Sequence, residues 1–74
     1  MKTEQELIDY ILTNGEIILY DSLGDQRLIN YDKNKESLYY LRWFPRENTG
    51  EPREYLTFEK AIQIIQKEKP EFLK

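Results

Sequence analysis

The side chains that most often carry out chemistry in proteins are missing from this chain, which has neither histidine nor cysteine. These two residue types supply most of the proton transfer, nucleophilic attack and transition-metal binding that proteins perform near neutral pH. The remaining nucleophile candidates are hydroxyl groups with no histidine to activate them, and neither Ser-x-x-Lys nor Gly-x-Ser-x-Gly spacing occurs. We therefore expect no enzymatic activity, no cofactor and no bound metal.

A second chemical candidate is Asp21-Ser22-Leu23-Gly24-Asp25, in which two carboxylates flank a glycine. A calcium-binding loop needs oxygen ligands at alternating positions and a terminal glutamate, and this segment lacks that pattern. We expect a β-turn instead, with Asp21 accepting backbone amides and Gly24 at a positive φ.

Aromatic and guanidinium groups are the most distinctive chemistry that remains. The chain has six tyrosines, three phenylalanines and one tryptophan, and several of them lie close to arginines. Such side chains anchor protein interfaces, and they also stack on the bases of single-stranded nucleic acids. The net charge of −3 and the scattered lysines give no continuous basic stripe, so a nucleic acid is not the favoured partner.

Acidic residues are concentrated in the first third of the chain. Residues 1–26 hold six acids and one base, whereas residues 27–74 hold eight acids and ten bases. This surplus predicts either a negative face that docks on a basic partner or a solvated helix surface with acids in a hairpin turn. Tyr10 lies among these acids, where it either anchors a partner or lies over a neighbouring loop.

Two helices are predicted at the ends of the chain. Thr3-Glu4-Gln5-Glu6 has the pattern of a capping box, apolar residues at helical spacing follow it, and Asn14-Gly15 ends the helix. The first helix should therefore span about residues 3–13. Thr57 caps the second helix, which Pro70 terminates.

Between the helices the apolar residues follow the pattern of β-strands. Residues 17–20, 27–32 and 37–44 are β-prone and are separated by polar turns, and Tyr55-Leu56 is a candidate short fourth strand. The sequence thus predicts a single α+β domain over residues 1–74. Its order is helix, three- or four-stranded antiparallel meander, helix, with both helices packed on one face of the sheet.

The third strand carries most of the aromatic residues. Alternation places two groups on opposite faces: Tyr39, Leu41 and Trp43 on one, and Leu38, Tyr40, Arg42 and Phe44 on the other. Both faces are apolar or aromatic, so the strand is either central or presents one face to a partner. Because Arg42 is charged, we expect the face with Tyr40 and Phe44 to be the open one.

Residues 45–54 form a connection that is long for so small a domain and rich in charge and helix-breaking residues. It is either a binding loop or the tip of a hairpin. In a hairpin, Arg46 could pair with Glu54, or Glu47 with Arg53.

The function predicted from these features is that of a non-enzymatic protein-binding module, a small acidic regulator or inhibitor of a larger partner, for which a nucleic-acid-processing protein is one candidate. Its expected partner contacts are Glu6, Asp9, Tyr10, Tyr40, Arg42, Phe44 and Arg46. One alternative is a single-stranded nucleic-acid-binding domain that uses the sheet aromatics, and another is a self-associating domain that forms a homodimer.

The setting expected for the protein is the cytoplasm, without a membrane. No uninterrupted apolar run is longer than that of residues 17–20, which is far shorter than the roughly 20 residues that cross a bilayer, and the lack of cysteine fits a reducing compartment. The residue usage is typical of an AT-rich genome and indicates a bacterial or phage source.

Overall fold

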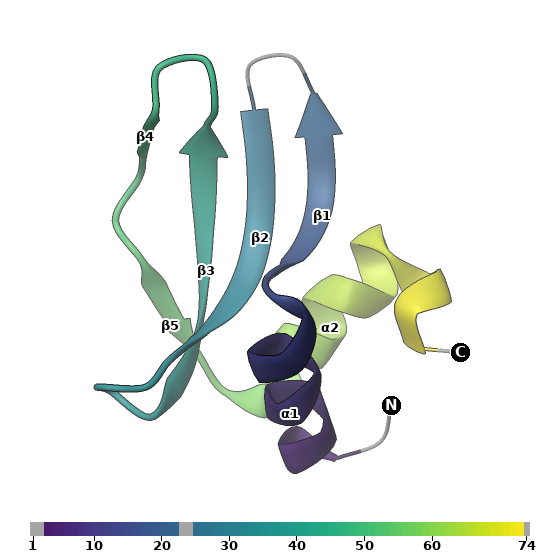
Figure 1. The fold of residues 1–74 in the computed structure, drawn as a ribbon. Helices are drawn as coiled ribbons and strands as arrows, with labels where there is room; N and C mark the ends of the chain where they lie inside the picture. Colours follow the sequence, from purple (N-terminus) through teal and green to yellow (C-terminus); the bar gives the residue numbers. More distant parts are fainter. Residues whose placement is uncertain (1–2, 23–24, 74) are drawn as a thin grey trace.

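The computed structural model describes residues 3–22 and 25–73. Its elements, in chain order, are α1 (Glu4–Asn14), β1 (Ile17–Ser22), β2 (Asp25–Asp32), β3 (Ser37–Phe44), β4 (Thr49–Gly50), β5 (Glu54–Leu56), α2 (Phe58–Glu68) and a 3₁₀-helix, η1 (Pro70–Leu73) (Figure 1). The predicted α+β arrangement of a helix, an antiparallel sheet and a second helix is confirmed. Neither α1 nor α2 is long and apolar enough to cross a membrane.

The strands form one antiparallel sheet in which β3 is central. β2 pairs with β3 from Gln26 opposite Trp43 to Asp32 opposite Ser37, and β1 pairs with the other edge of β2. On the far side of β3, β5 pairs with residues 38–40 and β4 with the last two residues. β4 and β5 are thus two pieces of one interrupted edge strand. Pro52 lies in the interruption, where its lack of an N–H prevents regular pairing.

Both helices begin where the sequence predicts. The Thr3 hydroxyl accepts a hydrogen bond from the Glu6 amide at 3.2 Å, and the Thr57 hydroxyl accepts one from the Lys60 amide at 3.2 Å. The Glu6 carboxylate accepts from the Thr3 hydroxyl at 3.1 Å, so the contact between these two side chains differs from that of a capping box. α1 ends at Asn14 and is capped by Gly15, whose φ of +96° is one that glycine adopts readily.

The predicted turn over residues 21–26 is wrong in its extent. β1 continues to Ser22 and β2 begins at Asp25, so the strands extend into the segment that its polar composition marks as a turn. The expected roles of the Asp21 side chain and of Gly24 lie outside the part of the chain that the structure describes. β1 is an edge strand with a register shift between Ile18 and Tyr20, and Lys69 Nζ donates to the Ile18 carbonyl at 3.0 Å.

Both helices pack on the same face of the sheet, as predicted. One buried cluster joins α1 and α2 to β1, β2, β3 and β5; its members are Leu7, Ile11, Ile17, Leu19, Ile29, Leu38, Leu56, Ala61 and Ile65. We call the side of the sheet that carries these strand residues the helix-covered face. Tyr40 lies opposite Ile29 in the register and packs against this cluster.

The prediction that Tyr40 and Phe44 mark the open face of β3 is therefore wrong. Tyr40 is half-buried against the core, although Arg42, two residues later on the same face, is exposed. The reason is that the helices cover only one end of the sheet, while the two hairpins extend beyond them (Figure 1). Arg42 lies past the helices, where it pairs with Asp25 at 3.6 Å and Glu51 at 3.5 Å.

The core assignment can be tested with a pair of helical residues. Ile65 on α2 is fully buried, at 0% exposure. Ile65→Ala should lower the free energy of unfolding by about 2–5 kcal/mol, because it leaves a cavity between α2 and the sheet. A domain this small has a total stability of roughly 5 kcal/mol, so urea unfolding followed by circular dichroism should show a marginal fold.

Leu12→Ala is the matched control, because Leu12 lies on α1 and is 50% exposed. It should change the free energy of unfolding by less than about 0.5 kcal/mol. Equal losses in the two variants would contradict the placement of the core.

Candidate functional site: the aromatic face of the sheet

The face of the sheet opposite the helices carries a continuous group of apolar and aromatic side chains. Residues directly opposite each other on neighbouring strands share a face, and the register places Leu28 opposite Leu41 and Tyr39 opposite Tyr55. We define the aromatic face as Ile18, Leu28, Tyr39, Leu41, Trp43 and Tyr55. None of these residues belongs to the core cluster that the helices cover.

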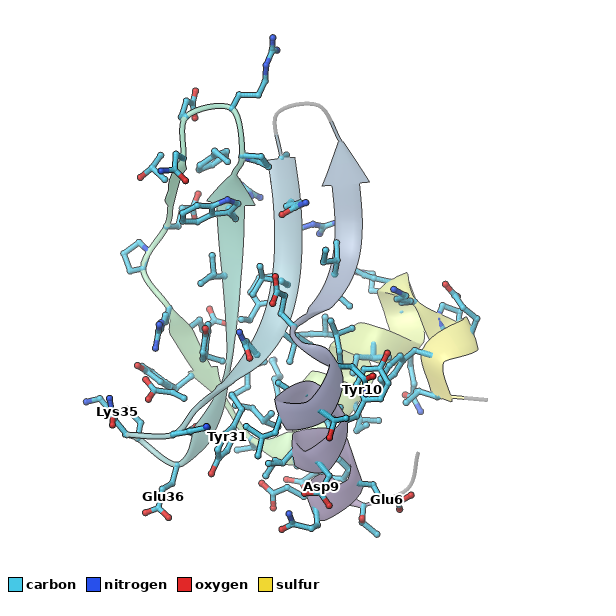
Figure 2. All side chains as sticks on the ribbon, viewed as in Figure 1. Glu6, Asp9, Tyr10, Tyr31, Lys35 and Glu36 are labelled. Atoms are coloured by element: carbon cyan, nitrogen blue, oxygen red, sulfur yellow. The ribbon has the colours of Figure 1, made fainter. Side chains whose placement is uncertain are left out.

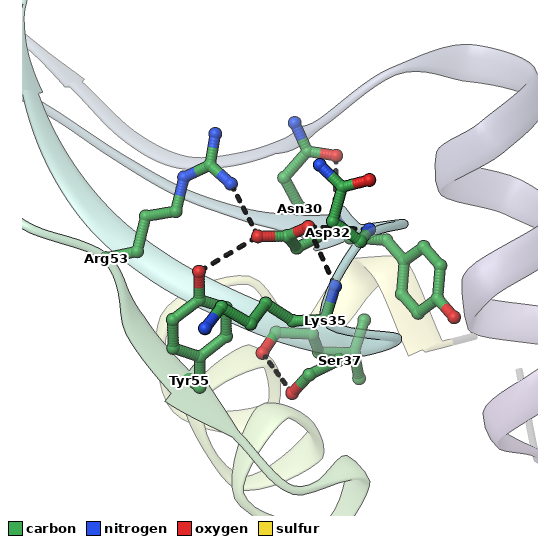
Figure 3. A network of polar contacts seen from close by, with 9 residues as sticks. Asn30, Asp32, Lys35, Ser37, Arg53 and Tyr55 are labelled. Carbon is green, nitrogen blue, oxygen red and sulfur yellow. Dashed lines mark hydrogen bonds and ion pairs between the residues drawn. The ribbon is translucent and has the colours of Figure 1, made fainter.

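At one end of the aromatic face, Asp32 organises a network of polar contacts (Figure 3). Asp32 ends β2, and its side chain is only 9% exposed. Its Oδ1 accepts hydrogen bonds from the backbone amides of Asn34 at 2.9 Å and Lys35 at 3.1 Å. Its Oδ2 accepts from Arg53 Nη1 at 2.8 Å and from the Tyr55 hydroxyl at 2.9 Å. One carboxylate thus joins β2, the turn that follows it, and the segment that leads into β5.

The turn between β2 and β3 depends on the same side chain. A carboxylate that accepts amides two and three residues later is a common turn-forming arrangement for Asp. Glu36 closes this turn with a φ of +52°, in the left-handed region that side chains other than glycine adopt at a cost. The two backbone hydrogen bonds that Asp32 accepts in the turn offset this cost, and β3 then begins with Ser37 opposite Asp32.

Arg53 and Tyr55 together cover Tyr39. The guanidinium carbon of Arg53 lies 4.3 Å from the centroid of the Tyr39 ring, a cation–π contact. Tyr55 meets the same ring edge to face, with the centroids 6.2 Å apart. Tyr39 is therefore only 6% exposed although no helix lies over it. Because Asp32 bonds to both covering side chains, it determines how Tyr39 is shielded.

The same contacts fix the charge state of the network. The hydrogen bond from the Tyr55 hydroxyl, followed by that from the Lys35 backbone amide, lowers the pKa of Asp32 below its ordinary value of 3.8. Asp32 is therefore ionised at neutral pH, and Arg53 balances its charge. Lys35 Nζ lies 6.0 Å from the centroid of the Tyr55 ring, which adds a second cation to this end of the face.

The other end of the aromatic face is formed by Trp43 against the backbone of β4. Gly50 lies opposite Trp43, and a Cβ added to Gly50 would lie 2.6 Å from Trp43 Cε3, closer than real Cβ atoms approach a neighbour. The indole therefore lies directly on the β4 backbone, and glycine is required here for close approach. Trp43 and Tyr39 are four residues apart on β3, about 13 Å, with Leu41 and its partner Leu28 between them.

The residues predicted to contact a partner do not form one surface. Glu6 and Asp9 are exposed on α1 at one end of the molecule, whereas the turn with Arg46 joins β3 to β4 at the opposite end (Figures 1 and 2). Asp9 accepts a hydrogen bond from the Gln5 side chain at 2.8 Å. Phe44 is half-buried near that far turn. The role of these residues in binding stays a prediction.

Tyr10 lies over a neighbouring segment, which was one of the two alternatives for it. Its ring meets Phe72 of η1 edge to face, with centroids 4.8 Å apart and planes at 84°, and it remains 38% exposed (Figure 2). The sequence predicts no element after Pro70, because a helix as short as η1 has no periodicity to detect.

The network around Asp32 is the part of the site that sequence reasoning missed. The charge pattern of residues 45–54 indicates a pair between Glu47 and Arg53, but the partner of Arg53 is Asp32, 21 residues earlier. Asp32 is recognisable in the sequence as a turn former. Only the register of β3 with both neighbouring strands reveals that Arg53 and Tyr55 meet it.

Residues 3–22 and 25–73 contain no pocket and no group of three side chains that could hold a metal ion. The aromatic face therefore lacks the features of a small-molecule or metal site.

The chain was compared with models of protein families, with curated proteins and with solved structures. No match was found. The function of the aromatic face therefore has to be inferred from its own residues.

The position of Trp43 can be tested with Gly50→Ala. The new methyl group should push the indole away from β4, lower the free energy of unfolding by about 1–3 kcal/mol, and shift the native emission to longer wavelength. Trp43 is the only tryptophan, so its fluorescence reports on this site alone.

Gly15→Ala is the control, because Gly15 has a φ of +96° and no atom within 4 Å of an added Cβ. It should destabilise the fold through backbone strain and leave the native emission unchanged. An unaltered emission spectrum in Gly50→Ala would show that the indole does not lie on β4.

Asp32→Asn should remove part of the acid sensitivity of the fold. Because the pKa of Asp32 is lowered in the folded state, its ionised form stabilises the fold above the ordinary value of 3.8, and this contribution is lost as the pH falls through the lower folded-state pKa. The wild type should therefore lose more free energy of unfolding than Asp32→Asn between about pH 5 and pH 2, as measured by urea titration at each pH.

Glu47→Gln is the matched control for this pH series, since it removes an exposed carboxylate from the turn between β3 and β4. It should follow the wild type. If Asp32→Asn and the wild type have the same pH dependence, the Asp32 carboxylate does not make these bonds in the folded protein.

Proposed function

We propose that this chain is a non-enzymatic protein-binding module whose aromatic face contacts a larger protein that it regulates or inhibits. The observation that carries this proposal is the cluster in which Asp32 holds Arg53 and Tyr55 against Tyr39, on a side of the sheet that neither helix covers.

The composition of the aromatic face supports a protein partner. Tyrosine, tryptophan and arginine are the residue types that contribute most to binding at protein interfaces. Here Tyr55 is 44% exposed and Arg53 lies beside it, bonded to the same oxygen of Asp32, while Trp43 is partly exposed at the other end of the face. Polar residues on this side of β2 are mostly neutral, with Gln26 opposite Trp43 in the register. An interface centre with few charges and several aromatic rings has this composition.

The side chains of the aromatic face are also held in place before any partner binds. Immobilising a flexible side chain at an interface costs about 0.5–1.5 kcal/mol, and a side chain that is already fixed avoids most of this cost. Asp32 fixes Arg53 and Tyr55 by hydrogen bonds, and the β4 backbone at Gly50 fixes Trp43. Because its side chains are preorganised, the aromatic face can bind a partner as a rigid surface.

The shape of the face suits a protein surface better than a small ligand. Small molecules are bound in concave sites that bury most of their surface. The described residues form no pocket, and Tyr39, Leu41 and Trp43 follow one another along a single strand. A partner would therefore contact an extended row of side chains.

The proposal predicts that capture of a partner depends on the aromatic face. Leu41→Gln should abolish recovery of a protein that the tagged wild type captures from a lysate of its own cells, identified by mass spectrometry. With the purified partner, the affinity should fall by about tenfold or more, because an apolar contact at the centre is replaced by an amide.

Leu12→Gln is the matched control, since Leu12 is an exposed leucine on α1, away from the aromatic face. It should bind as the wild type does, and both variants should retain the wild-type circular dichroism. Equal binding by Leu41→Gln and the wild type, or recovery of the chain's own copies alone, would exclude this proposal.

A further inference from the structure

Resting on the proposed function, we infer that the partner is a protein segment that places an acidic side chain beside Lys35 and Arg53 and an apolar side chain on Leu41 and Trp43. The positive charges around the Asp32 network favour the acidic side chain, and the row of side chains that leads away from this network favours the apolar one.

The outward charge at this end of the aromatic face is positive. Asp32 is only 9% exposed and each of its oxygens accepts two hydrogen bonds, so its negative charge is directed inward. Arg53 is 47% exposed at its side chain, and Lys35 is exposed in the turn. Two cations thus face the solvent beside a carboxylate that is already fully engaged.

The nearby acids do not cancel this charge. Glu51 pairs with Arg42, which belongs to the opposite side of β3, and Glu54 lies opposite Tyr40 on the helix-covered face. Glu36 follows Lys35 in the turn, but the two side chains extend in different directions (Figure 2). An acidic group of a partner could therefore approach Lys35 and Arg53 without meeting a carboxylate that repels it.

The rest of the molecule would orient such a partner. Residues 3–26 contain six acids and no base, and three of these acids lie on α1, which packs on the helix-covered face. An acidic partner is repelled by α1 and attracted by the end of the aromatic face that carries Lys35 and Arg53. Charges arranged in this way select the orientation of encounter more than they add to affinity.

A protein segment fits the face better than a single-stranded nucleic acid. A nucleic acid carries a phosphate at every nucleotide and needs cations along its whole path. On the aromatic face, Lys35 and Arg53 lie at one end, while Leu28, Leu41 and Trp43 occupy the remaining length of about 13 Å. Leu41, which is partly exposed between the aromatic residues, offers a contact to an apolar side chain and no stacking platform for a base.

The inference is tested by selecting binders from a random-peptide library displayed on phage against the immobilised full chain. Selected peptides should be enriched in Asp and Glu, together with apolar residues, relative to the unselected library. Synthetic versions of them should change the emission of Trp43 on binding, and oligo(dT) of similar length should leave it unchanged. Lys35→Glu should weaken these peptides by about tenfold and shift a repeated selection away from acidic residues.

Lys60→Glu is the matched control, because this substitution makes the same change of charge on α2, which packs on the helix-covered face. It should bind the selected peptides as the wild type does. If the peptides depend on Leu41 but show no enrichment in acids, or if Lys35→Glu binds them unchanged, the acidic partner is excluded and the proposed function stands. If no peptide requires the aromatic face, or if oligo(dT) binds there instead, both are excluded.

Discussion

The aromatic face of this protein depends on one carboxylate. Asp32 accepts four hydrogen bonds, two from backbone amides of the turn that follows it and two from side chains of the segment that leads into β5 and of β5 itself. The first pair sets the turn that starts β3, and the second pair holds Arg53 and Tyr55 over Tyr39. A nearly buried charge is costly unless it is paired and hydrogen-bonded. Each hydrogen bond that satisfies the Asp32 carboxylate also shapes the aromatic face. The same four hydrogen bonds therefore both stabilise the fold and set the geometry of the aromatic face.

The limited cover that the helices provide explains why the contacts of Asp32 with Arg53 and Tyr55 are needed. The two helices cover one end of one side of the sheet, and the second side is shielded by the sheet's own side chains or by another molecule. At one end, Arg53 and Tyr55 cover Tyr39 in place of a third layer. At the other end, Trp43 lies against Gly50, which leaves an ordered but partly exposed row of apolar groups between. A face that is ordered and incompletely covered is suited to binding another protein, and this is the basis of the function proposed for it.

The sequence allowed most of the secondary structure and the two-layer arrangement to be predicted, because both depend on local signals. Threonine caps, helical spacing and Gly15 define α1, the alternation in residues 37–44 defines β3, and Pro70 ends α2. The open face could not be predicted in the same way. Arg42 indicated the wrong side of β3, since one strand can be covered by helices at Tyr40 and extend past them two residues later. The bonds of Asp32 to Arg53 and Tyr55 could not be predicted either, because they join residues more than twenty positions apart and exist only in the observed register.

The central claim, that Asp32 holds Arg53 on the ring of Tyr39, can be measured directly by NMR. The side-chain protons of Arg53 should resonate well upfield of their values in an unfolded chain, because they lie over an aromatic ring in the wild-type protein. In Asp32→Asn the same protons should move back toward the unfolded values while the core resonances of Ile29 and Ile65 stay in place. Arg53 shifts near the unfolded values in the wild type, or upfield shifts that persist in Asp32→Asn, would contradict this account.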